Sequence, residues 1–424
     1  MLGLIFIIFF IALLPLGLPM VSSYALAFVI PSFLEGSYGM VDIVGWFVKA
    51  SESTIFVAIV LFIVAGIVMS KGQLTEKIFD VFAYGLGNLR GCIPVVAVLT
   101  AIFYGMISGS GIAVVAAVGA MVLPFLTELG YNKLFFGAML AAAGSLGQLL
   151  PPSSAILQYS VMAGTDETVM FRAGAVIGFT CAAALLVVTL LYCRIDVGDE
   201  EKIRAYYLSL RKRGFKDIMS TSIWALLSPL IILGGIFSEV LTVVEAAAVS
   251  VVYSSVVAVF IYKSLDFKGL WKTFVGSVKN VASMAMMLTV ASAFTNLLDV
   301  FNGAQIIGDL ATSAFSTPNS FILASIVIMT GAMLFLNPIA IIVPIVAPLA
   351  LQFGLDHIVY GAGMSGIVAI GSLTPPFGMS LFIMAPIIQE DPMKLAKKVF
   401  PLWLLMTLII SIFMFFPQLA AWAY

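Results

Sequence analysis

Two short stretches interrupt the long apolar segments of this chain, and both contain paired prolines. The first, residues 147–153, contains Pro151-Pro152, and the second, residues 371–378, contains Pro375-Pro376. Each proline pair removes two backbone donors and disfavours helical geometry in the residue before it. In a bilayer, backbone groups freed in this way must be buried or must line a cavity. The two breaks therefore indicate a binding site within the membrane.

The surroundings of the two breaks repeat along the chain at one fixed offset of 224 residues. Corresponding Gly/Pro-interrupted apolar segments in two halves are the best sequence indication of a secondary transporter's binding site. The alternative is two unrelated proline kinks, which does not account for eight identities at one offset. The matching pairs are Pro124/Pro348, Gly130/Gly354, Gly137/Gly361, Ala138/Ala362, Gly147/Gly371, Leu149/Leu373, Pro151/Pro375 and Pro152/Pro376.

Two further apolar stretches, residues 92–125 and 319–352, are each cut in the middle by small polar residues. The first has Ser108-Gly109-Ser110 at this point, and the second has Asn337. Each arm is about 15 residues long, too short for a crossing with its own loop, which predicts re-entrant helical hairpins. A hairpin tip and a broken helix at one depth bring together unpaired carbonyls, hydroxyls and helix ends.

This combination of groups predicts sites for a cation and a carboxylate. Carbonyl and hydroxyl oxygens suit a hard monovalent cation, and positive helix N-termini suit a carboxylate. No carboxylate or histidine lies at either tip or break, which favours sodium over protons as the coupling ion. The alternative is that these small residues only allow helices to pack closely.

The residues assigned to these predicted sites fall into three sets. Sodium site 1 comprises Ser108, Ser110, Gly147, Leu149 and Pro151. Sodium site 2 comprises Asn337, Gly371, Thr374 and Pro375. The substrate carboxylate is expected between Ser108, Gly109, Ser110, Pro152, Ser153, Thr374, Pro376 and Gly378.

Composition supports a membrane setting for these sites. The 424 residues are 62% hydrophobic and only 10% charged, with a mean hydropathy of +1.16. These values predict an integral membrane protein with room for about ten to thirteen segments. The net charge of -1 gives no reason to expect a nucleic-acid partner. No ATP-binding, dinucleotide, zinc or Ser-His-Asp pattern appears, so we expect neither an enzyme nor an organic cofactor.

The distribution of positive charge predicts the topology. Placing the basic stretch 194–217 in the cytoplasm puts every lysine and arginine there except Lys49 and Arg172. The two hairpins then enter from opposite sides, so the repeats are inverted. We expect residues 2–18 to form a first membrane helix rather than a removed signal. The other predicted spans are 20–34, 53–69, 134–162 (broken), 171–193, 222–237, 242–262, 280–298, 358–388 (broken) and 399–421.

The ordered set of motifs resembles the large membrane (M) subunit of the tripartite ATP-independent periplasmic (TRAP) transporters over nearly the whole chain. The N-terminal half contributes residues 62–66, 89–91, 105–110, 141–144 and 151–153. The C-terminal half contributes residues 228–237, 245–249 and 373–378.

The resemblance implies an all-α polytopic membrane protein with inverted repeats and an elevator-type mechanism. It also implies sodium-coupled uptake of an organic acid, such as a C4-dicarboxylate, a sialic acid or a sugar or keto acid, across a bacterial or archaeal inner membrane. A periplasmic substrate-binding (P) protein would deliver the solute, and a small membrane (Q) subunit, expected as a separate chain, would brace the scaffold.

The resemblance and the repeat together predict a division of the chain. Scaffold spans are expected in residues 1–91 and 171–318, with the cytoplasmic arm 194–217, and a C-terminal span in 391–424. Residues 92–170 and 319–390 are the two transport repeats. A binding-protein-independent sodium/dicarboxylate symporter of related architecture is the main alternative. A membrane-embedded enzyme lacks a catalytic constellation, and a channel lacks a reason for hairpins of opposite orientation.

Overall fold

The computed structural model describes residues 40–52, 54–72, 74–86, 92–278, 317–333, 339–375 and 378–424, with isolated positions at 22, 26, 29, 282, 285, 286, 289 and 315. Every regular element in these residues is a helix, in agreement with the all-α fold that the family resemblance implies. The predicted spans 2–18, 20–34 and 280–298 lie outside the described ranges. So do Asn337 at the second predicted tip and Pro376 in the second break.

Six of the described helices are long and apolar enough to cross a membrane. They are α4 (Thr54–Lys71), α7 (Gly111–Glu128), α10 (Glu167–Tyr192), α12 (Phe215–Phe237), α20 (Pro392–Phe415), and α13 (Val243–Val256) with the π turn η3 (Val257–Ile261) that continues it.

Three of these helices begin earlier than the predicted spans, so the predicted boundaries were wrong there. α10 begins at 167 rather than 171 because the Asp166 carboxylate accepts the backbone N–H groups of Thr168 and Val169, at 2.8 and 3.0 Å. α20 begins at 392 rather than 399, with Asp391 as its N-cap. α12 begins at 215 rather than 222. Hydropathy marks apolar residues, whereas the polar caps Asp166 and Asp391 set where α10 and α20 start. α12 instead follows Gly214, which makes no side-chain cap bond.

The first half of the repeat forms four consecutive helices around the 147–153 break. They are α6 (Cys92–Ser108), α7, α8 (Lys133–Ser145) and α9 (Ser154–Ala163), with the short 3-10 turn η2 (Leu146–Gln148) after α8. α6 and α7 pack against each other on either side of residues 109–110. The second half has α16 (Pro318–Ala332), α17 (Ile339–Gln352), α18 (His357–Gly371) and α19 (Met379–Ile388) in the same order.

Local geometry repeats at the 224-residue offset. Gly130 and Gly354 both adopt left-handed backbone, with φ of 84° and 67°. Asn132 and Asp356 both cap the next helix by accepting two backbone N–H groups. The helix contacts between the two halves also come in pairs that the same offset relates. α7 packs on α19 as α17 packs on α9, and α8 packs on α20 as α18 packs on α10. The two halves therefore interlock through equivalent pairs of helices.

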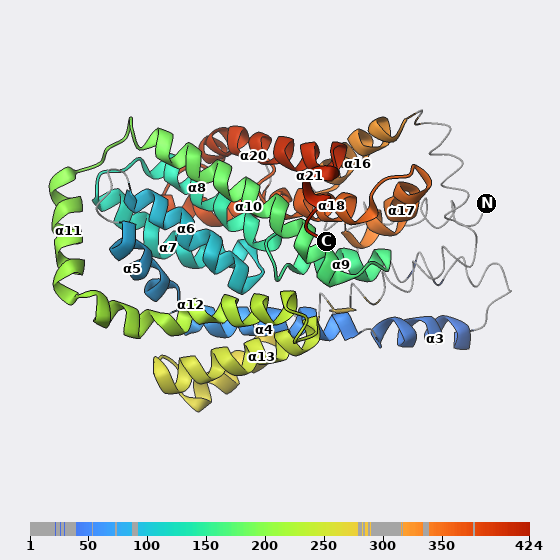
Figure 1. The fold of residues 1–424 in the computed structure, drawn as a ribbon, viewed down its shortest axis with the longest axis horizontal. Coiled ribbons are helices and arrows are strands. Elements are labelled where there is room, and N and C mark those ends of the chain that lie inside the picture. Colours follow the sequence, from blue (N-terminus) through green and yellow to red (C-terminus); the bar gives the residue numbers. More distant parts are fainter. Residues whose placement is uncertain are drawn as a thin grey trace.

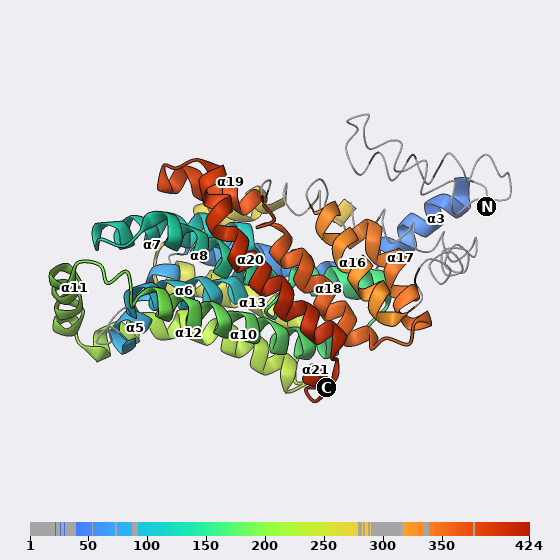
Figure 2. The same cartoon turned by 90° about the horizontal axis from the view of Figure 1, so that it is seen from above.

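Figure 1 shows α4, α12 and α13 along one edge of the molecule, where α13 packs on both α4 and α12. The helices of the two halves, with α10 and α20, form the larger part beside them, and Figure 2 shows α20 running across α8 and α18. α11 (Glu200–Arg213) stands at the end of the molecule and bridges the two parts. α5 (Leu74–Leu86) packs on α6 and α12, α3 (Met40–Ser51) precedes α4 in the chain, and α21 (Gln418–Ala421) follows α20.

Candidate functional site

Glycines allow the first predicted tip and the first break to touch through their backbones. A Cβ built on Gly147 would lie 2.5 Å from the Cα of Gly105, and one on Gly105 would lie 2.7 Å from the Cα of Gly147. A Cβ on Gly66 of α4 would lie 2.8 Å from the carbonyl oxygen of Ser108. These separations leave no room for side chains, so α4, α6 and η2 meet at backbone contact distance.

Two helix N-termini converge at this junction. Ser110 caps α7 by accepting the N–H of Ala113 at 3.4 Å, and Ser153 caps α9 by accepting the N–H of Ile156 at 3.0 Å. The Ser154 hydroxyl donates to the carbonyl oxygen of Gly109 at 2.8 Å and so ties the break to the tip. Helix N-termini carry partial positive charge and unpaired N–H groups, so the junction favours an anion.

A cavity of about 590 Å³ opens beside this junction, between α4, α7 and α9. Lys71 is the one charged residue among the described residues that line it, and it is exposed at the end of α4. Its ammonium group lies 3.4 Å from the Thr273 hydroxyl. The other lining residues are Ile63, Gly66, Ile67, Ser70, Ser108, Gly109, Ser110, Ile112, Ala113, Ala116, Gln148, Ser154 and Gln158. The volume is within the range of small-molecule sites.

Gln158 contributes a buried polar group to this cavity. Its side-chain amide donates to the carbonyl oxygen of Ser154 at 3.1 Å. The residue is 5% exposed, and its amide oxygen has no hydrogen-bond partner among the described residues. A buried acceptor without a partner is costly, so this oxygen is suited to a donor or cation supplied by a ligand.

The structure brings most residues of predicted sodium site 1 to this junction. Ser108 and Ser110 line the cavity, and Gly147 lies against Gly105. The carbonyl oxygen of Leu149 instead lies beside α10, 3.5 Å from a Cβ built on Gly174.

The predicted substrate residues beside site 1 are distributed around the same junction. Gly109 lines the cavity, and the carbonyl oxygen of Pro152 lies 3.4 Å from a Cβ built on Gly109. Ser153 is buried at the same break, where its hydroxyl donates to the carbonyl oxygen of Gln148. Pro151, which belongs to predicted sodium site 1, is buried there as well.

The second break folds into a compact turn of its own. The N–H of Gly378 donates to the carbonyl oxygen of Thr374 at 2.9 Å, and the N–H of Ser380 donates to that of Ser372 at 3.0 Å. The Thr374 hydroxyl is buried and has no hydrogen-bond partner in the described part of the chain. An orphaned oxygen of this kind fits a cation ligand.

The remaining residues of site 2 are only partly gathered at this turn. Gly371 packs against Met333, and Pro375 is half-buried beside Thr374. Asn337 and Pro376 lie outside the described residues. Thr374 and Gly378 are not among the described residues that line the 590 Å³ cavity, so that cavity belongs to the first half.

Lys71, Gln148, Ser154 and Gln158 were missed as site residues by reasoning from the sequence. Ser154 and Gln158 stand four residues apart in a largely apolar helix, which places both on one face. That spacing is a signal the sequence contains. Lys71 carries no such signal, because it ends an ordinary apolar helix and only the packing of α4 on the tip brings it to the cavity.

The acidic residues nearest the spans have structural roles. Glu239 forms an ion pair with Arg172 at 2.9 Å. Glu245 forms a capping box with Thr242 at the start of α13, while Asp299 lies outside the described residues. Within the described ranges, no three His, Cys, Asp or Glu side chains cluster in a way that could hold a metal ion.

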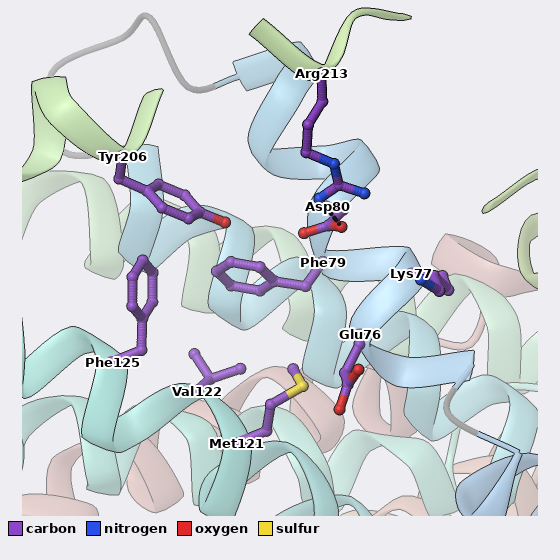
Figure 3. A pocket seen from close by; sticks show the side chains of 9 residues that line it. All are labelled: Glu76, Lys77, Phe79, Asp80, Met121, Val122, Phe125, Tyr206 and Arg213. Atoms are coloured by element: carbon purple, nitrogen blue, oxygen red, sulfur yellow. Dashed lines mark hydrogen bonds and ion pairs between the residues drawn. The ribbon is translucent and has the colours of Figure 1, made fainter. Parts of the chain in front are cut away.

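A second cavity, of about 390 Å³, lies between α5, α7 and α11 (Figure 3). Arg213 of α11 and Asp80 of α5 lie together at one side of it and form an ion pair at 2.8 Å. The hydrogen bond to Asp80 raises the pKa of Arg213. The Tyr206 ring packs on Phe125 of α7 with 4.7 Å between ring centroids, and burial raises the pKa of its hydroxyl.

The other end of α11 is attached to the base of the α6–α7 pair. The N–H of Asp199 donates to the carbonyl oxygen of Leu129 at 2.7 Å, and the N–H of Asn132 donates to the Asp196 carboxylate at 2.9 Å. α11 therefore links α5 to the loop between α7 and α8. Lys202 strengthens the attachment of α11 to the end of α7 by donating to the carbonyl oxygen of Glu128 at 3.3 Å.

Comparison with known proteins places these features in context. Residues 7–419 match the family model described as "Tripartite ATP-independent periplasmic transporter, DctM component". The chain is 30% identical over 418 residues to the isethionate TRAP transporter permease protein DctMQ of Oleidesulfovibrio alaskensis, covering 97% of this chain and 64% of that protein. It is also 30% identical over 370 residues to the C4-dicarboxylate TRAP transporter large permease protein DctM of Pseudomonas aeruginosa, covering 86% and 84% of the two chains.

Two solved structures share the fold. The YdaH transporter of Alcanivorax borkumensis superposes with a TM-score of 0.64 at 13% identity, covering 99% of this chain and 98% of that one. MtrF of Neisseria gonorrhoeae superposes with a TM-score of 0.64 at 15% identity, covering 98% and 95%. At these identities the likeness concerns the fold alone.

Proposed function

The chain belongs to the DctM component family of the tripartite ATP-independent periplasmic transporters, and we propose that it transports an organic acid into the cell by coupling its uptake to sodium. It is a large permease rather than an enzyme. The observation that supports the proposal most directly is the 590 Å³ cavity, where the N-termini of α7 and α9 and the ammonium group of Lys71 favour an anion.

The names of the relatives are consistent with an acidic solute. Beside the isethionate and C4-dicarboxylate permeases, the chain is 27% identical to the sialic acid permease SiaM of Vibrio cholerae over 96% of its length. It is 27% identical to the 2,3-diketo-L-gulonate permease YiaN of Escherichia coli over 88%. Isethionate is a sulfonate and the other three are carboxylates, so an anionic head group is common to these four.

Sodium is proposed at the two breaks. In the first, Ser108, Ser110 and backbone oxygens of residues 147–151 would supply ligands; in the second, Thr374 with Asn337 and the backbone of residues 371–375. The orphaned Thr374 hydroxyl supports the second site, and hydroxyl and carbonyl oxygens are the donors that hard cations prefer. Sodium would order each tip against its break before the solute binds.

The movement we propose is an elevator-like displacement of residues 92–170 and 319–390 against a scaffold of residues 1–91, 171–318 and 391–424. The packing of α7 on α19 and of α17 on α9 supports motion of the two repeats as one body.

The protein would lie in the inner membrane of a bacterium or archaeon, with residues 194–217 in the cytoplasm. The two hairpins would be re-entrant from opposite sides.

A periplasmic substrate-binding protein and a small membrane subunit are the proposed partners. The name DctMQ of the isethionate permease, of whose length this chain matches 64%, supports a Q-type subunit. The main alternative is a symporter of the same architecture that needs no binding protein.

Uptake into proteoliposomes tests the proposal. This chain, together with a small membrane subunit, would be exposed to radiolabelled organic acids under an imposed sodium gradient, with and without the binding protein. We expect uptake that requires both sodium and the binding protein. Uptake that needs sodium alone would favour the alternative symporter, and uptake that follows a proton gradient without sodium would refute the cation sites.

The ion sites have their own variants. Ser110→Ala, Asn337→Ala and Thr374→Ala should each raise the sodium concentration needed for half-maximal uptake, because each removes an oxygen ligand. Ser255→Ala is a matched control, since its hydroxyl only bonds the carbonyl oxygen of Val251 in the same helix, at 2.7 Å. Normal sodium dependence in all three site variants would refute the assignment of these ligands.

A further inference from the structure

The first-half cavity has two different ends. Gly66 contacts Ser108 at the tip, whereas Lys71 lies five residues further along α4. At 1.5 Å per helical residue, the two ends are separated by about 7–8 Å along α4. Helix N-termini and Gln158 are located toward the tip end, and the exposed Lys71 is located at the other.

Each end selects a different chemical group. Lys71 has no acidic partner among the described residues, so its ammonium group is available to an anion from solution. Gln158 is different because its amide N–H already bonds Ser154, which leaves the amide oxygen as an acceptor. This oxygen is buried and unpaired, and a ligand that supplies a donor would remove the cost of burying it.

Among the described residues, the polar groups next to Gln158 do not meet this need. The Ser154 hydroxyl donates to the carbonyl oxygen of Gly109, and the Ser153 hydroxyl donates to that of Gln148. The donors that these two hydroxyls offer are therefore already used. A hydroxyl group on the solute is a chemically suitable partner, because it supplies a donor without adding positive charge beside the helix N-termini.

We propose that Lys71 and Gln158 determine specificity, and that the solute is a carboxylate bearing at least one hydroxyl donor. This inference rests on the proposed transport function and names the substrate class of the same cavity. The carboxylate binds at the Lys71 end of the cavity, and the donor reaches the amide oxygen of Gln158 toward the tip. A plain aliphatic acid leaves that oxygen unpaired and binds more weakly.

Matched pairs of acids that differ in hydroxylation test the proposal on the chain assembled with its small membrane subunit. The pairs are succinate and malate, butyrate and 3-hydroxybutyrate, and hexanoate and gluconate. Binding is measured as the ligand concentration that gives half of the maximal thermal stabilisation in detergent with sodium present. In at least one pair, the hydroxylated acid should bind ten-fold or more tightly than its plain counterpart.

Two variants separate the roles of the two residues. Gln158→Met has a similar volume and no acceptor, so it should abolish the preference within the pair. Lys71→Met should weaken both members of a pair about threefold, because an exposed cation is partly screened. Lys272→Met is the control, since this exposed lysine is adjacent to Thr273 but does not line the cavity.

Three results would overturn the inference: equal binding within every pair, a preference that persists in Gln158→Met, or no stabilisation by any of the acids. The comparison within wild-type pairs does not depend on whether a variant folds. Equal binding within pairs alongside sodium-driven uptake would refute this inference and leave the transport function standing. Absence of sodium-driven uptake would refute the transport function itself.

Discussion

The contact between Gly105 and Gly147 gives the most direct test of the arrangement at the first break. In Gly147→Ala the new methyl carbon would lie 2.5 Å from the Cα of Gly105 and 2.9 Å from its carbonyl carbon. Optimal carbon–carbon contact is about 3.5–4.0 Å, so the two backbones must separate by roughly 1 Å. Neither atom belongs to a flexible side chain that could rotate away.

The expected cost of Gly147→Ala is about 1–3 kcal/mol of unfolding free energy, which is typical of overpacking in a close-packed interior. The same separation moves the tip at Ser108 away from the break, so uptake should fall as well. Gly105→Ala should behave alike, with a Cβ 2.7 Å from the Cα of Gly147. The double variant should cost less than the sum, because one separation accommodates both methyl groups.

Gly234→Ala is the matched control, because this glycine lies inside α12 and a Cβ there meets no atom within 4 Å. Alanine is favoured over glycine in a helix by up to about 1 kcal/mol, so this variant should be unchanged or slightly more stable. Equilibrium unfolding in mixed detergent micelles measures all four variants, with uptake in proteoliposomes as the second readout. If Gly147→Ala matches Gly234→Ala in both assays, the backbone contact does not exist as described.

Three further outcomes follow from the capping, ion-pair and pH-sensitive contacts of the chain. Ser153→Ala removes the N-cap of α9 and should lower the unfolding free energy by about 0.5–2 kcal/mol; unchanged unfolding would contradict the cap. A double-mutant cycle on Asp80 and Arg213 should give a coupling of about 0.2–1 kcal/mol that shrinks with added salt, and zero coupling at low salt would argue against the pair across the second cavity. The hydrogen bond from Lys133 lowers the pKa of Glu390. The ionised Glu390 carboxylate therefore stabilises the folded protein fully above the ordinary carboxyl pKa, and this contribution is lost as the pH falls through the lowered pKa of the folded state. The stability difference between wild type and Glu390→Gln should therefore vanish in acid, and a difference that is constant between pH 7 and pH 3 would refute the contact.

The sequence by itself determined the class of the protein, the places where its helices break, and the correspondence of its halves. The first two features depend on consecutive residues: long apolar runs indicate a membrane, and paired prolines remove backbone donors in any tertiary context. The third is a comparison of residue types along the chain. The offset of 224 residues predicted that Gly130 and Gly354 are equivalent, and both adopt left-handed backbone. Helix starts were less well predicted, because a cap such as Asp166 adds turns that hydropathy does not detect.

Tertiary structure alone decided which residues meet. Gly66, Gly105 and Gly147 are separate glycines along the chain, and only packing shows that their missing side chains allow three segments to touch. Lys71 and Gln158 lie 87 positions apart in sequence, yet both line one cavity. The physical reason is that local propensities act over a few residues, whereas contacts between distant segments depend on how whole helices pack, which no short pattern encodes.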